Sequence, residues 1–276
     1  MKKIERIYNG PNTTIQTGIV SLFGEVSYSS LMSCIRKKDI KVNGTRVTIN
    51  HIIKNGDTIT IYIDSKELKE INIIYKDENI IVVNKNKGIK SVGEGSLENL
   101  LRESLNVEIY PVHRLDTNTS GLIMYALNEK AQSVLVSAFK NKKIQKEYTV
   151  KVFGKPKTNH ALLQDYLIKD AEKGMVRILK NKQPGAVQCI TEYFLESFEH
   201  NVSTLRVVLH TGRTHQIRAH LAYYGLPIVG DTKYGDFKLN KEFGANKQDL
   251  ISSCIILNIE SSDMLLGYLS SKIFKL

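Results

Sequence analysis

The stretch HRLDTNTSGL at residues 113–122 decides what fold and what chemistry this chain is expected to have. The residues after it, 123–127, are a continuous apolar run that predicts a short buried strand. The Thr, Asn, Ser and Gly residues before that run are typical of a turn, which can display a side chain at the end of the strand. Asp116 stands in this turn near Arg114, and a neighbouring cation keeps a carboxylate ionised. We therefore expect Asp116 to be a reactive carboxylate.

A purely structural role is the alternative for Asp116. An Asp in a turn can accept hydrogen bonds from local backbone N–H groups, with Arg114 as its surface ion-pair partner. For an isolated Arg-x-Asp this interpretation is favoured, because most surface ion pairs are structural. The whole stretch, however, resembles the HRLDxxTSGL signature of the RluA-type RNA pseudouridine synthases, whose single Asp is the catalytic residue. The resemblance favours catalysis by Asp116.

Charge and hydropathy indicate a partner for the chain. Its 276 residues, of which 42% are hydrophobic, are enough for one large domain and one small domain. A formal charge of +11 and a pI near 9.4 favour polyanionic partners, of which nucleic acid is the first choice and membrane lipid the alternative. No apolar stretch approaches the roughly 20 residues that span a bilayer, and the first residues lack the apolar core of a signal peptide. We expect a cytoplasmic, monomeric RNA-binding protein.

Cysteine and histidine spacing argues against a metal site. Cys34, Cys189 and Cys254 are far apart and odd in number, which favours neither a disulfide framework nor a thiolate zinc site. We expect thiols in a reducing compartment. His210, His215 and His220 recur at steps of five, whereas one helix face needs steps of three or four. We therefore expect no metal and no other cofactor, and we expect His215 and His220 to brace the site through hydrogen bonds.

The first 65 residues predict a small basic module. Apolar spacing predicts a helix over 14–26 and a second helix that starts near Ser29. An Asn-Gly pair predicts a hairpin over 40–47, and alternation predicts a strand over 58–63. This order resembles the S-four-type (alpha-L) RNA-binding domain, which implies that the basic residues of the module contact RNA. These residues are Arg36, Lys37, Lys38, Lys41 and Arg46. A solvated face beside a helix C-terminus is an equally weighted alternative for the basic run.

The remainder predicts the larger domain. Expected strands cover 79–83, 146–154, 205–209 and 251–257, and a helix capped by Asn128 covers 131–139. Another helix begins through Thr214 as N-cap and is closed by Gly225. We place the RNA-binding domain at 1–65, a charged linker at 66–71 and the catalytic domain at 72–276. The resemblance implies an α+β fold, in which a mixed, largely antiparallel β-sheet flanked by helices forms the catalytic domain, preceded by a small α/β-hairpin RNA-binding domain.

Tyr148 lies in the alternating strand 146–154, where it shares a face with Val150 and Val152. Periodicity alone predicts a core aromatic residue. Tyr148 also stands where the family has its active-site Tyr in K-x-Y, which implies a ring that stacks on an unstacked uracil and a hydroxyl that can relay a proton. The resemblance favours the second interpretation.

Residues 211–221, TGRTHQIRAHL, match the family motif TGRTHQIRxHL in full, and 225–235 match the segment that follows it. The resemblance implies that Arg218 pairs with Asp116, whereas a helix-surface cation is the alternative. It also implies that His113, Arg114, Arg213 and His215 contact RNA, with Arg114 able to fill the space that a flipped base leaves.

One motif departs from the family. Residues 84–88 read Asn-Lys-Asn-Lys-Gly, where the family has Asn-Lys-Pro-Ala-Gly, and the loop loses the rigidity that Pro gives. We expect Lys85 to be a solvated loop lysine. The function implied by the resemblance is isomerisation of uridine to pseudouridine in structured RNA, ribosomal RNA before transfer RNA, by Asp116, Tyr148 and Arg218. A non-catalytic RNA-binding protein is the alternative, and a glycosidase is disfavoured because it ordinarily needs two carboxylates.

Overall fold

The structure is a computed structural model that describes residues 2–23, 26, 28–64, 71–170, 172 and 174–276. The chain divides into two compact units, Met1–Asn72 with Ile89–Ile109, and Ile73–Gly88 with Tyr110–Leu276. The expected linker lies outside the described residues except for Ile71, so the exact domain boundaries stay a prediction. Among the described residues, no helix is long and apolar enough to cross a membrane.

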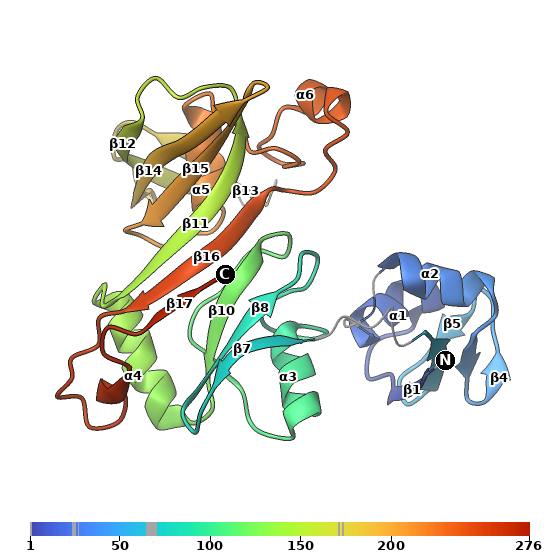
Figure 1. Cartoon of the computed structure of the whole chain (residues 1–276). Helices are drawn as coiled ribbons and strands as arrows, with labels where there is room; N and C mark the ends of the chain where they lie inside the picture. The colour runs from blue at the N-terminus through green and yellow to red at the C-terminus, as the bar shows by residue number, and fades with distance from the viewer. Residues whose placement is uncertain (1, 24–25, 27, 65–70, 171, 173) are drawn as a thin grey trace. The chain divides into compact units, whose positions relative to one another are not determined.

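The described part of the first unit contains short strands and helices, drawn in blue to green in Figure 1. Its elements are β1 (Lys2–Ile7), β2 (Thr13–Thr14), α1 (Ile15–Leu22), α2 (Tyr28–Arg36), β3 (Ile40–Val42), β4 (Thr45–Arg46), β5 (Ile52–Ile53), β6 (Thr58–Ile63) and α3 (Leu97–Leu105). Thr14 caps α1 by accepting the N–H of Thr17. Asn43 and Gly44 have φ values of 49° and 81°, as a tight hairpin turn requires. The two expected helices, the hairpin and the strand at 58–63 are confirmed.

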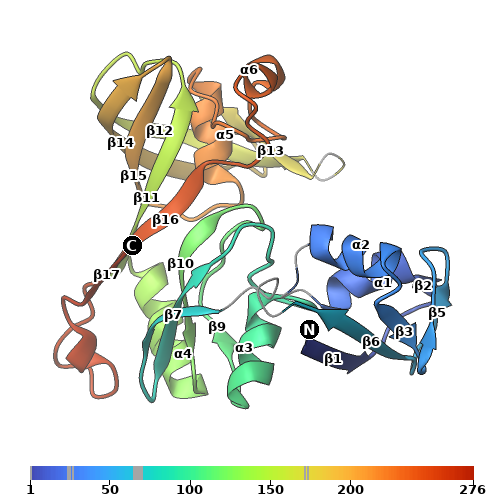
Figure 2. The same ribbon diagram turned by 45° about the vertical axis from the view of Figure 1, so that its right-hand side comes forward.

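The larger unit is built on one long sheet, seen from two directions in Figures 1 and 2. Its strands are β7 (Asn72–Lys76), β8 (Ile80–Lys85), β9 (Tyr110–Pro111), β10 (Ser120–Ala126), β11 (Ile144–Phe153), β12 (His160–Asp170), β13 (Met175–Leu179), β14 (Val187–Glu199), β15 (Val202–Leu209), β16 (Leu250–Leu257) and β17 (Ile273–Lys275). The order is β13-β12-β14-β15-β11-β16-β10-β8-β7, with β17 on β16 and β9 on β10. Among the described strands only β10 and β16 pair in parallel. The expected α+β fold with a mixed, largely antiparallel sheet is confirmed.

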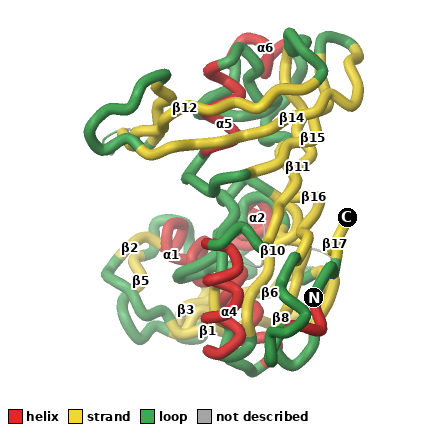
Figure 3. The backbone as a smooth tube through the Cα atoms, turned by 90° about the vertical axis from the view of Figure 1, so that its left-hand side faces the viewer, coloured by secondary structure: helices red, strands yellow, loops and turns green. Residues whose placement is uncertain are grey.

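Helices cover this sheet at two places, as Figure 3 shows. They are α4 (Glu129–Lys140), which packs on β10 and β11, and α5 (Gln216–Tyr223), which packs on β13 and β14. A third helix, α6 (Phe237–Glu242), and a short 3₁₀ helix, Gly267–Leu269, lie in the connections. Asn128 caps α4 as expected, because its side chain accepts the N–H of Ala131 at 2.9 Å. The main core lies between α4 and the β8, β10 and β16 strands.

Gly121 explains the last part of the 113–122 motif. It pairs with Ser252 across the parallel β10–β16 contact and has a φ of 106°. A Cβ atom there would lie 2.3 Å from the Ser252 carbonyl oxygen. Only glycine therefore allows β16 to approach the start of β10. This close approach fixes the strand that directly follows the Asp116 turn.

Candidate active site

The three expected catalytic residues, Asp116, Tyr148 and Arg218, line one pocket of about 100 Å³ in the larger unit. The expected RNA contacts Arg114, Arg213 and His215 line it as well. The remaining lining residues are Leu115, Thr119, Lys146, Leu209, Gly212, Thr214, Gln216, Ile217 and Leu250. The fold thus gathers the 113–122, 146–154 and 211–221 motifs at one site, although Asp116 and Arg218 are 102 positions apart.

The turn that carries Asp116 is held by backbone and lysine contacts. The N–H of Thr119 donates to the carbonyl of Asp116 at 3.0 Å, and the N–H of Gly88 donates to the carbonyl of Thr117 at 2.8 Å. Lys85 Nζ donates to the same Thr117 carbonyl at 3.1 Å and to that of Asn86 at 3.2 Å. Lys85 is fully buried, so the expected solvated loop lysine is wrong. Its ammonium group joins the 84–88 loop to the Asp116 turn.

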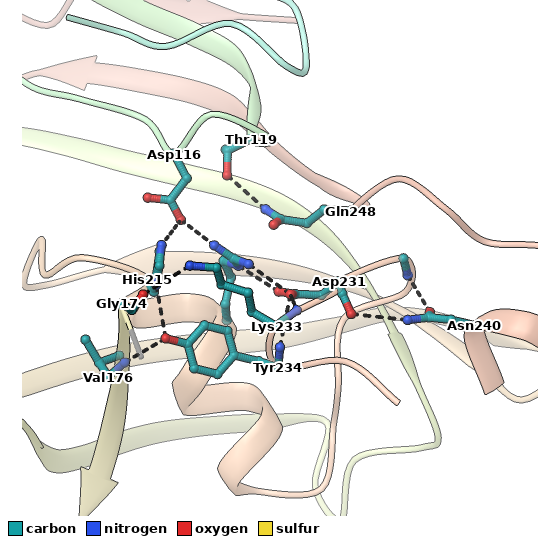
Figure 4. A network of polar contacts seen from close by, with 12 residues as sticks. Asp116, Thr119, Gly174, Val176, His215, Asp231, Lys233, Tyr234, Asn240 and Gln248 are labelled. Atoms are coloured by element: carbon teal, nitrogen blue, oxygen red, sulfur yellow. Dashed lines mark hydrogen bonds and ion pairs between the residues drawn. The ribbon is translucent and has the colours of Figure 1, made fainter. Parts of the chain in front are cut away.

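A second contact holds the end of the same turn. Thr119 is almost fully buried, and its hydroxyl accepts a 3.0 Å hydrogen bond from the Gln248 amide. Gln248 directly precedes the β16 region, and Figure 4 shows it beside Thr119. The Asp116 turn is therefore attached both to the 84–88 loop and to the segment that leads into β16. Such attachments pre-organise a carboxylate.

Arg218 is the charge partner of Asp116. Its Nη1 donates to Asp116 Oδ2 at 3.2 Å, while Nε and Nη2 donate to the two carboxylate oxygens of Asp231 at 2.7 and 2.9 Å. Its side chain is only 6% exposed, which excludes a helix-surface cation. Burial lowers the pKa of Arg218, but hydrogen bonds and charge from Asp231 and then Asp116 outweigh burial and raise it overall. The guanidinium therefore stays charged and clamped beside Asp116.

Asp231 is the buried anchor of this network. Its Oδ1 also accepts the N–H groups of Lys233 at 2.8 Å and Tyr234 at 3.1 Å. Burial raises the pKa of Asp231. The hydrogen bonds and charge of Arg218, and the hydrogen bonds from the two backbone N–H groups, outweigh burial and lower this pKa overall. The ionised carboxylate holds Arg218 by a two-point contact, which fixes the direction of the guanidinium.

His215 approaches the same Asp116 oxygen as Arg218. Its Nε2 is 3.9 Å from Asp116 Oδ2, and its Nδ1 is hydrogen-bonded to the Tyr234 hydroxyl at 3.0 Å. That hydroxyl in turn accepts the N–H of Val176 at 2.7 Å, as Figure 4 shows. Because the Tyr234 hydroxyl accepts from Val176, its own proton is free to be donated to Nδ1. Burial lowers the pKa of His215. The charge of Asp116 raises this pKa, but burial together with the charge of Arg218 outweighs that effect, so a neutral ring is favoured at neutral pH.

Tyr148 and Lys146 enter the pocket from β11. The Tyr148 side chain is 4% exposed, and the expected alternation with Val150 and Val152 is confirmed. Burial, and then the charge of Asp116, raise the pKa of the Tyr148 hydroxyl, which stays protonated. Lys146 is half-buried, and burial lowers its pKa to about 8. The pocket thus combines a flat ring, a neutral hydroxyl and four cationic side chains, Arg114, Lys146, Arg213 and Arg218, with one carboxylate.

The expected RNA contacts of the larger unit differ in exposure. Arg114 and Arg213 are exposed at the edge of the pocket. His113 is turned into the protein: its Nε2 accepts the N–H of Met124 at 3.0 Å, and its ring lies 4.8 Å from that of Phe139. Burial, and then the charge of Lys146, hold the pKa of His113 well below its usual range. His113 therefore fastens the motif to β10 as a neutral ring.

The start of the helix in the 211–221 motif differs from expectation. Helix α5 begins at Gln216, and His215, with a φ of 54°, takes the cap position expected for Thr214, so that expectation is wrong. The turn before it is closed instead by Gln216, whose Oε1 accepts from Arg213 N–H at 3.1 Å and the Thr211 hydroxyl at 2.8 Å. Gly225 follows the end of α5 with a φ of 77°, in the left-handed conformation expected of a helix stop.

His220 braces the helix that carries Arg218 through hydrogen bonds, and its partners are Thr191 and Asp165, not Asp116. Its ring is fully buried between the Thr191 hydroxyl at 2.9 Å and Asp165 at 3.0 Å. It therefore ties α5 to β12 and β14 on the side of the helix that faces the sheet. His210 pairs with Glu192 at 2.8 Å. The three evenly spaced histidines thus bind different carboxylates or hydroxyls, because His210 follows strand β15, His215 takes the cap position before α5, and only His220 lies within α5.

The basic residues of the first unit are accessible. Arg36, Lys37, Lys38 and Arg46 are exposed or half-buried at its surface. Lys41 is half-buried, with its Nζ 5.5 Å from the centre of the Tyr62 ring. An RNA contact by the first unit stays a prediction.

The three cysteines of the chain, Cys34, Cys189 and Cys254, are buried.

Several residues of the site have no signal in the local sequence. Asp231 and Tyr234 stand in the segment 225–235, but no local pattern assigns them a role. Lys146 stands in K-x-Y, a motif in which the resemblance assigns a role to the Tyr alone. Thr119 and Gln248 are joined across 129 positions, which local patterns do not reveal.

Comparison with known proteins gives consistent matches. The family described as "RNA pseudouridylate synthase" matches residues 79–223. The "Ribosomal large subunit pseudouridine synthase D" of Buchnera aphidicola subsp. Baizongia pistaciae is 33% identical over 249 residues, covering 81% of this chain and 75% of the relative. The mitochondrial "tRNA pseudouridine(32) synthase" of Saccharomyces cerevisiae is 29% identical, covering 73% of this chain and 46% of the relative. The solved structure of "Human RNA Pseudouridylate Synthase Domain Containing 1" matches with a TM-score of 0.61 at 24% identity, over 70% of this chain and 80% of that one.

Proposed function

Because this chain belongs to the RNA pseudouridylate synthase family, we propose that it isomerises uridine to pseudouridine in ribosomal RNA with Asp116 as the catalytic carboxylate. The contact between Asp116 and the buried, doubly anchored Arg218 carries this proposal. Asp116 is also the single carboxylate among the described residues that line the pocket. A pocket with one carboxylate argues against glycoside hydrolysis, which ordinarily needs two.

The isomerisation balances without a co-reactant. The bond from N1 of uracil to C1′ of the ribose breaks, the base rotates, C5 bonds to C1′, and the hydrogen on C5 leaves as a proton while N1 gains one. A carboxylate can assist in two ways, by adding to C1′ or by removing the 2′ hydrogen as a proton to give a glycal. In both routes Asp116 reacts as a carboxylate, and the Arg218 guanidinium is positioned to hydrogen-bond to that carboxylate.

The other pocket residues have distinct roles in this proposal. The Tyr148 ring provides a surface for a uracil that has left its stack, and its protonated hydroxyl is a neutral hydrogen-bond donor near Asp116. Arg114 and Arg213, exposed at the rim, contact RNA phosphates, and Arg114 can occupy the space vacated by the flipped base. His215 and the basic residues of the first unit add further RNA contacts.

Ribosomal RNA is preferred to transfer RNA as the substrate. The relative from Buchnera, which the chain matches over most of both lengths, is named for the large ribosomal subunit. The yeast relative named for tRNA is covered over less than half of its length. We further propose that the protein acts as a monomer in the cytoplasm and requires neither a metal nor an organic cofactor.

Activity on total RNA from cells that lack the gene tests this proposal. The purified protein, without added metal or nucleotide, is expected to convert uridine to pseudouridine at specific positions of ribosomal RNA, as mapped by mass spectrometry of nuclease digests. Asp116→Asn is expected to abolish conversion while RNA affinity is retained. Conversion by the Asp116→Asn protein at the wild-type rate would overturn the role of Asp116. Modification confined to transfer RNA would overturn the choice of substrate.

A further inference from the structure

A second pocket lies beside the catalytic pocket in the larger unit and has a volume of about 530 Å³. Five cationic side chains line it, and no carboxylate is found among the described residues of its lining. The cations are Arg114, Lys140, Lys142, Lys146 and Arg213. Positive charge gathered around a concave surface is typical of phosphate binding. The reaction at Asp116 does not itself use Lys140 or Lys142.

The two pockets are adjacent and share part of their lining. Arg114, Lys146 and Arg213 line both of them, together with Leu209 and Gly212. A Cβ atom built at Gly212 would meet nothing closer than Lys146 Nζ, at 3.9 Å. The boundary is therefore formed by three cations, by Leu209 and by a residue without a side chain. A strand whose target base lies at Asp116 can pass over this boundary into the second pocket.

The floor of the second pocket is apolar and aromatic. It includes Val112, Phe139 and Ile144. Phe139 is half-buried, and Lys146 Nζ lies 5.5 Å from the centre of its ring. An aromatic ring between cations is the combination that binds a nucleotide, because the base stacks on the ring while the cations hold the phosphate.

We propose that the second pocket binds the nucleotide next to the target uridine along the RNA strand. The phosphodiester that joins the two nucleotides lies at the shared boundary, beside Arg114, Lys146 and Arg213. The neighbouring base packs against Phe139, and Lys140 and Lys142 hold the phosphate that follows. This inference rests on the proposed function, since it requires a target uridine at Asp116. It assigns the pocket a single-stranded RNA segment as its ligand.

Paired variants test the charge of the pocket. The double variant Lys140→Gln/Lys142→Gln is compared with Lys130→Gln, a change of an exposed lysine on α4 that does not line the pocket. The double variant is expected to raise KM for the modified ribosomal RNA about tenfold and to leave kcat within about twofold, because it removes binding made equally in the ground and transition states. With a single-stranded oligouridine RNA, the slope of log Kd against log salt should fall by about 0.7 for each phosphate that the variant no longer binds.

A second pair of variants tests the aromatic floor. Phe139→Leu is compared with Phe198→Leu, because Phe198 is partly exposed and also has a lysine, Lys155, 5.5 Å from its ring, but lies outside the pocket. Phe139→Leu is expected to weaken oligouridine binding about tenfold, as for removal of one stacked base, without changing the salt slope. Circular dichroism and thermal melting establish that each variant is folded.

The outcomes separate this inference from the proposed function. If the wild-type protein forms pseudouridine but the pocket variants match Lys130→Gln and Phe198→Leu in KM, Kd and salt slope, the pocket assignment is overturned and the function stands. If the wild-type protein forms no pseudouridine in any RNA, the proposed function fails. In that case a reduced slope in Lys140→Gln/Lys142→Gln would still support a single-stranded RNA segment in the pocket.

Discussion

Arg218 and Asp231 form a two-point ion pair inside the larger unit, with N–O distances of 2.7 and 2.9 Å and almost no solvent exposure of either side chain. Only the remaining nitrogen, Nη1, reaches Asp116. Asp231 therefore determines where Arg218 points, although Asp231 itself has no contact with the Asp116 carboxylate among the described interactions. The direction of the guanidinium depends on a residue 13 positions further along the chain.

Asp231→Asn is expected to reduce both stability and activity. It leaves the buried Arg218 charge with a weakened partner, and breaking such a pair costs about 3 kcal/mol or more of unfolding free energy. Because a misplaced guanidinium no longer orients Asp116, kcat should fall about 100-fold. Urea unfolding and single-turnover kinetics measure the two effects. Asp249→Asn is the control, since the 4.0 Å contact of Asp249 with Lys151 is partly exposed and worth less than about 1 kcal/mol. Equal effects of the two changes would contradict the role of Asp231.

Lys85→Met is expected to impair catalysis more than RNA binding. The change removes the ammonium group that joins the Thr117 carbonyl to the 84–88 loop, while the long apolar stem still fills the space. A looser Asp116 turn should lower kcat about tenfold, with Kd for RNA unchanged. Lys87→Met, a change of a half-buried lysine in the same loop, provides the comparison. A selective decrease of RNA affinity in Lys85→Met would show that the lysine acts on the substrate instead.

Tyr148→Phe and Tyr148→Leu are expected to distinguish the contribution of the Tyr148 ring to RNA binding from the contribution of its hydroxyl to kcat. Phe keeps the flat surface, so KM should change little while kcat falls through removal of the hydroxyl. Leu also removes the ring, so RNA binding should weaken by about 1–3 kcal/mol, the value of one stacked base. Steady-state kinetics with the mapped substrate distinguish the two. If Tyr148→Leu has the kcat, KM and RNA affinity of the wild-type protein, Tyr148 has a role in the core only.

The pH dependence of substrate capture is expected to follow Lys146. Burial lowers the pKa of Lys146 to about 8, so the amine is charged below that pH and neutral above it. Since the charged form binds phosphate, kcat/KM should be highest below this pKa and should fall as pH rises through it, because kcat/KM reports groups of the free enzyme. Lys146→Arg keeps its charge throughout and should remove this fall. An identical fall in Lys146→Arg would assign the titration to another group.

The elements that the sequence predicts correctly have local causes. Asn128 caps its helix, Asn43-Gly44 forms its turn, and β11 alternates, because each depends on neighbouring residues alone. The motif resemblance correctly brings Asp116, Tyr148 and Arg218 to one pocket. Periodicity by itself would leave Tyr148 in the core and Arg218 on a helix surface.

The features that the sequence does not predict have long-range causes. Lys85 is buried because it meets a carbonyl 32 positions away, and a lysine in a polar loop otherwise predicts exposure. The prediction that Thr214 caps the helix is wrong because the Gln216 side chain accepts the Arg213 N–H and closes the turn. The Thr214 hydroxyl before the helix does not reveal that another side chain takes this role. Asp231 and Gln248 act through partners that are close in space only because the fold places them there.

The insertion of β16 between β10 and β11 has a consequence for the order of biosynthesis. Residues 250–257 emerge from the ribosome after residues 116, 148 and 218, yet they lie inside the sheet, between β10, which follows the Asp116 turn, and β11, which carries Tyr148. A nascent chain that lacks β16 has its β10 and β11 strands unpaired with one another and an open apolar seam between them. The pocket, which Leu250 of β16 also lines, is therefore complete only once β16 has been synthesised, and pairing between strands that are distant in the sequence is slow to form.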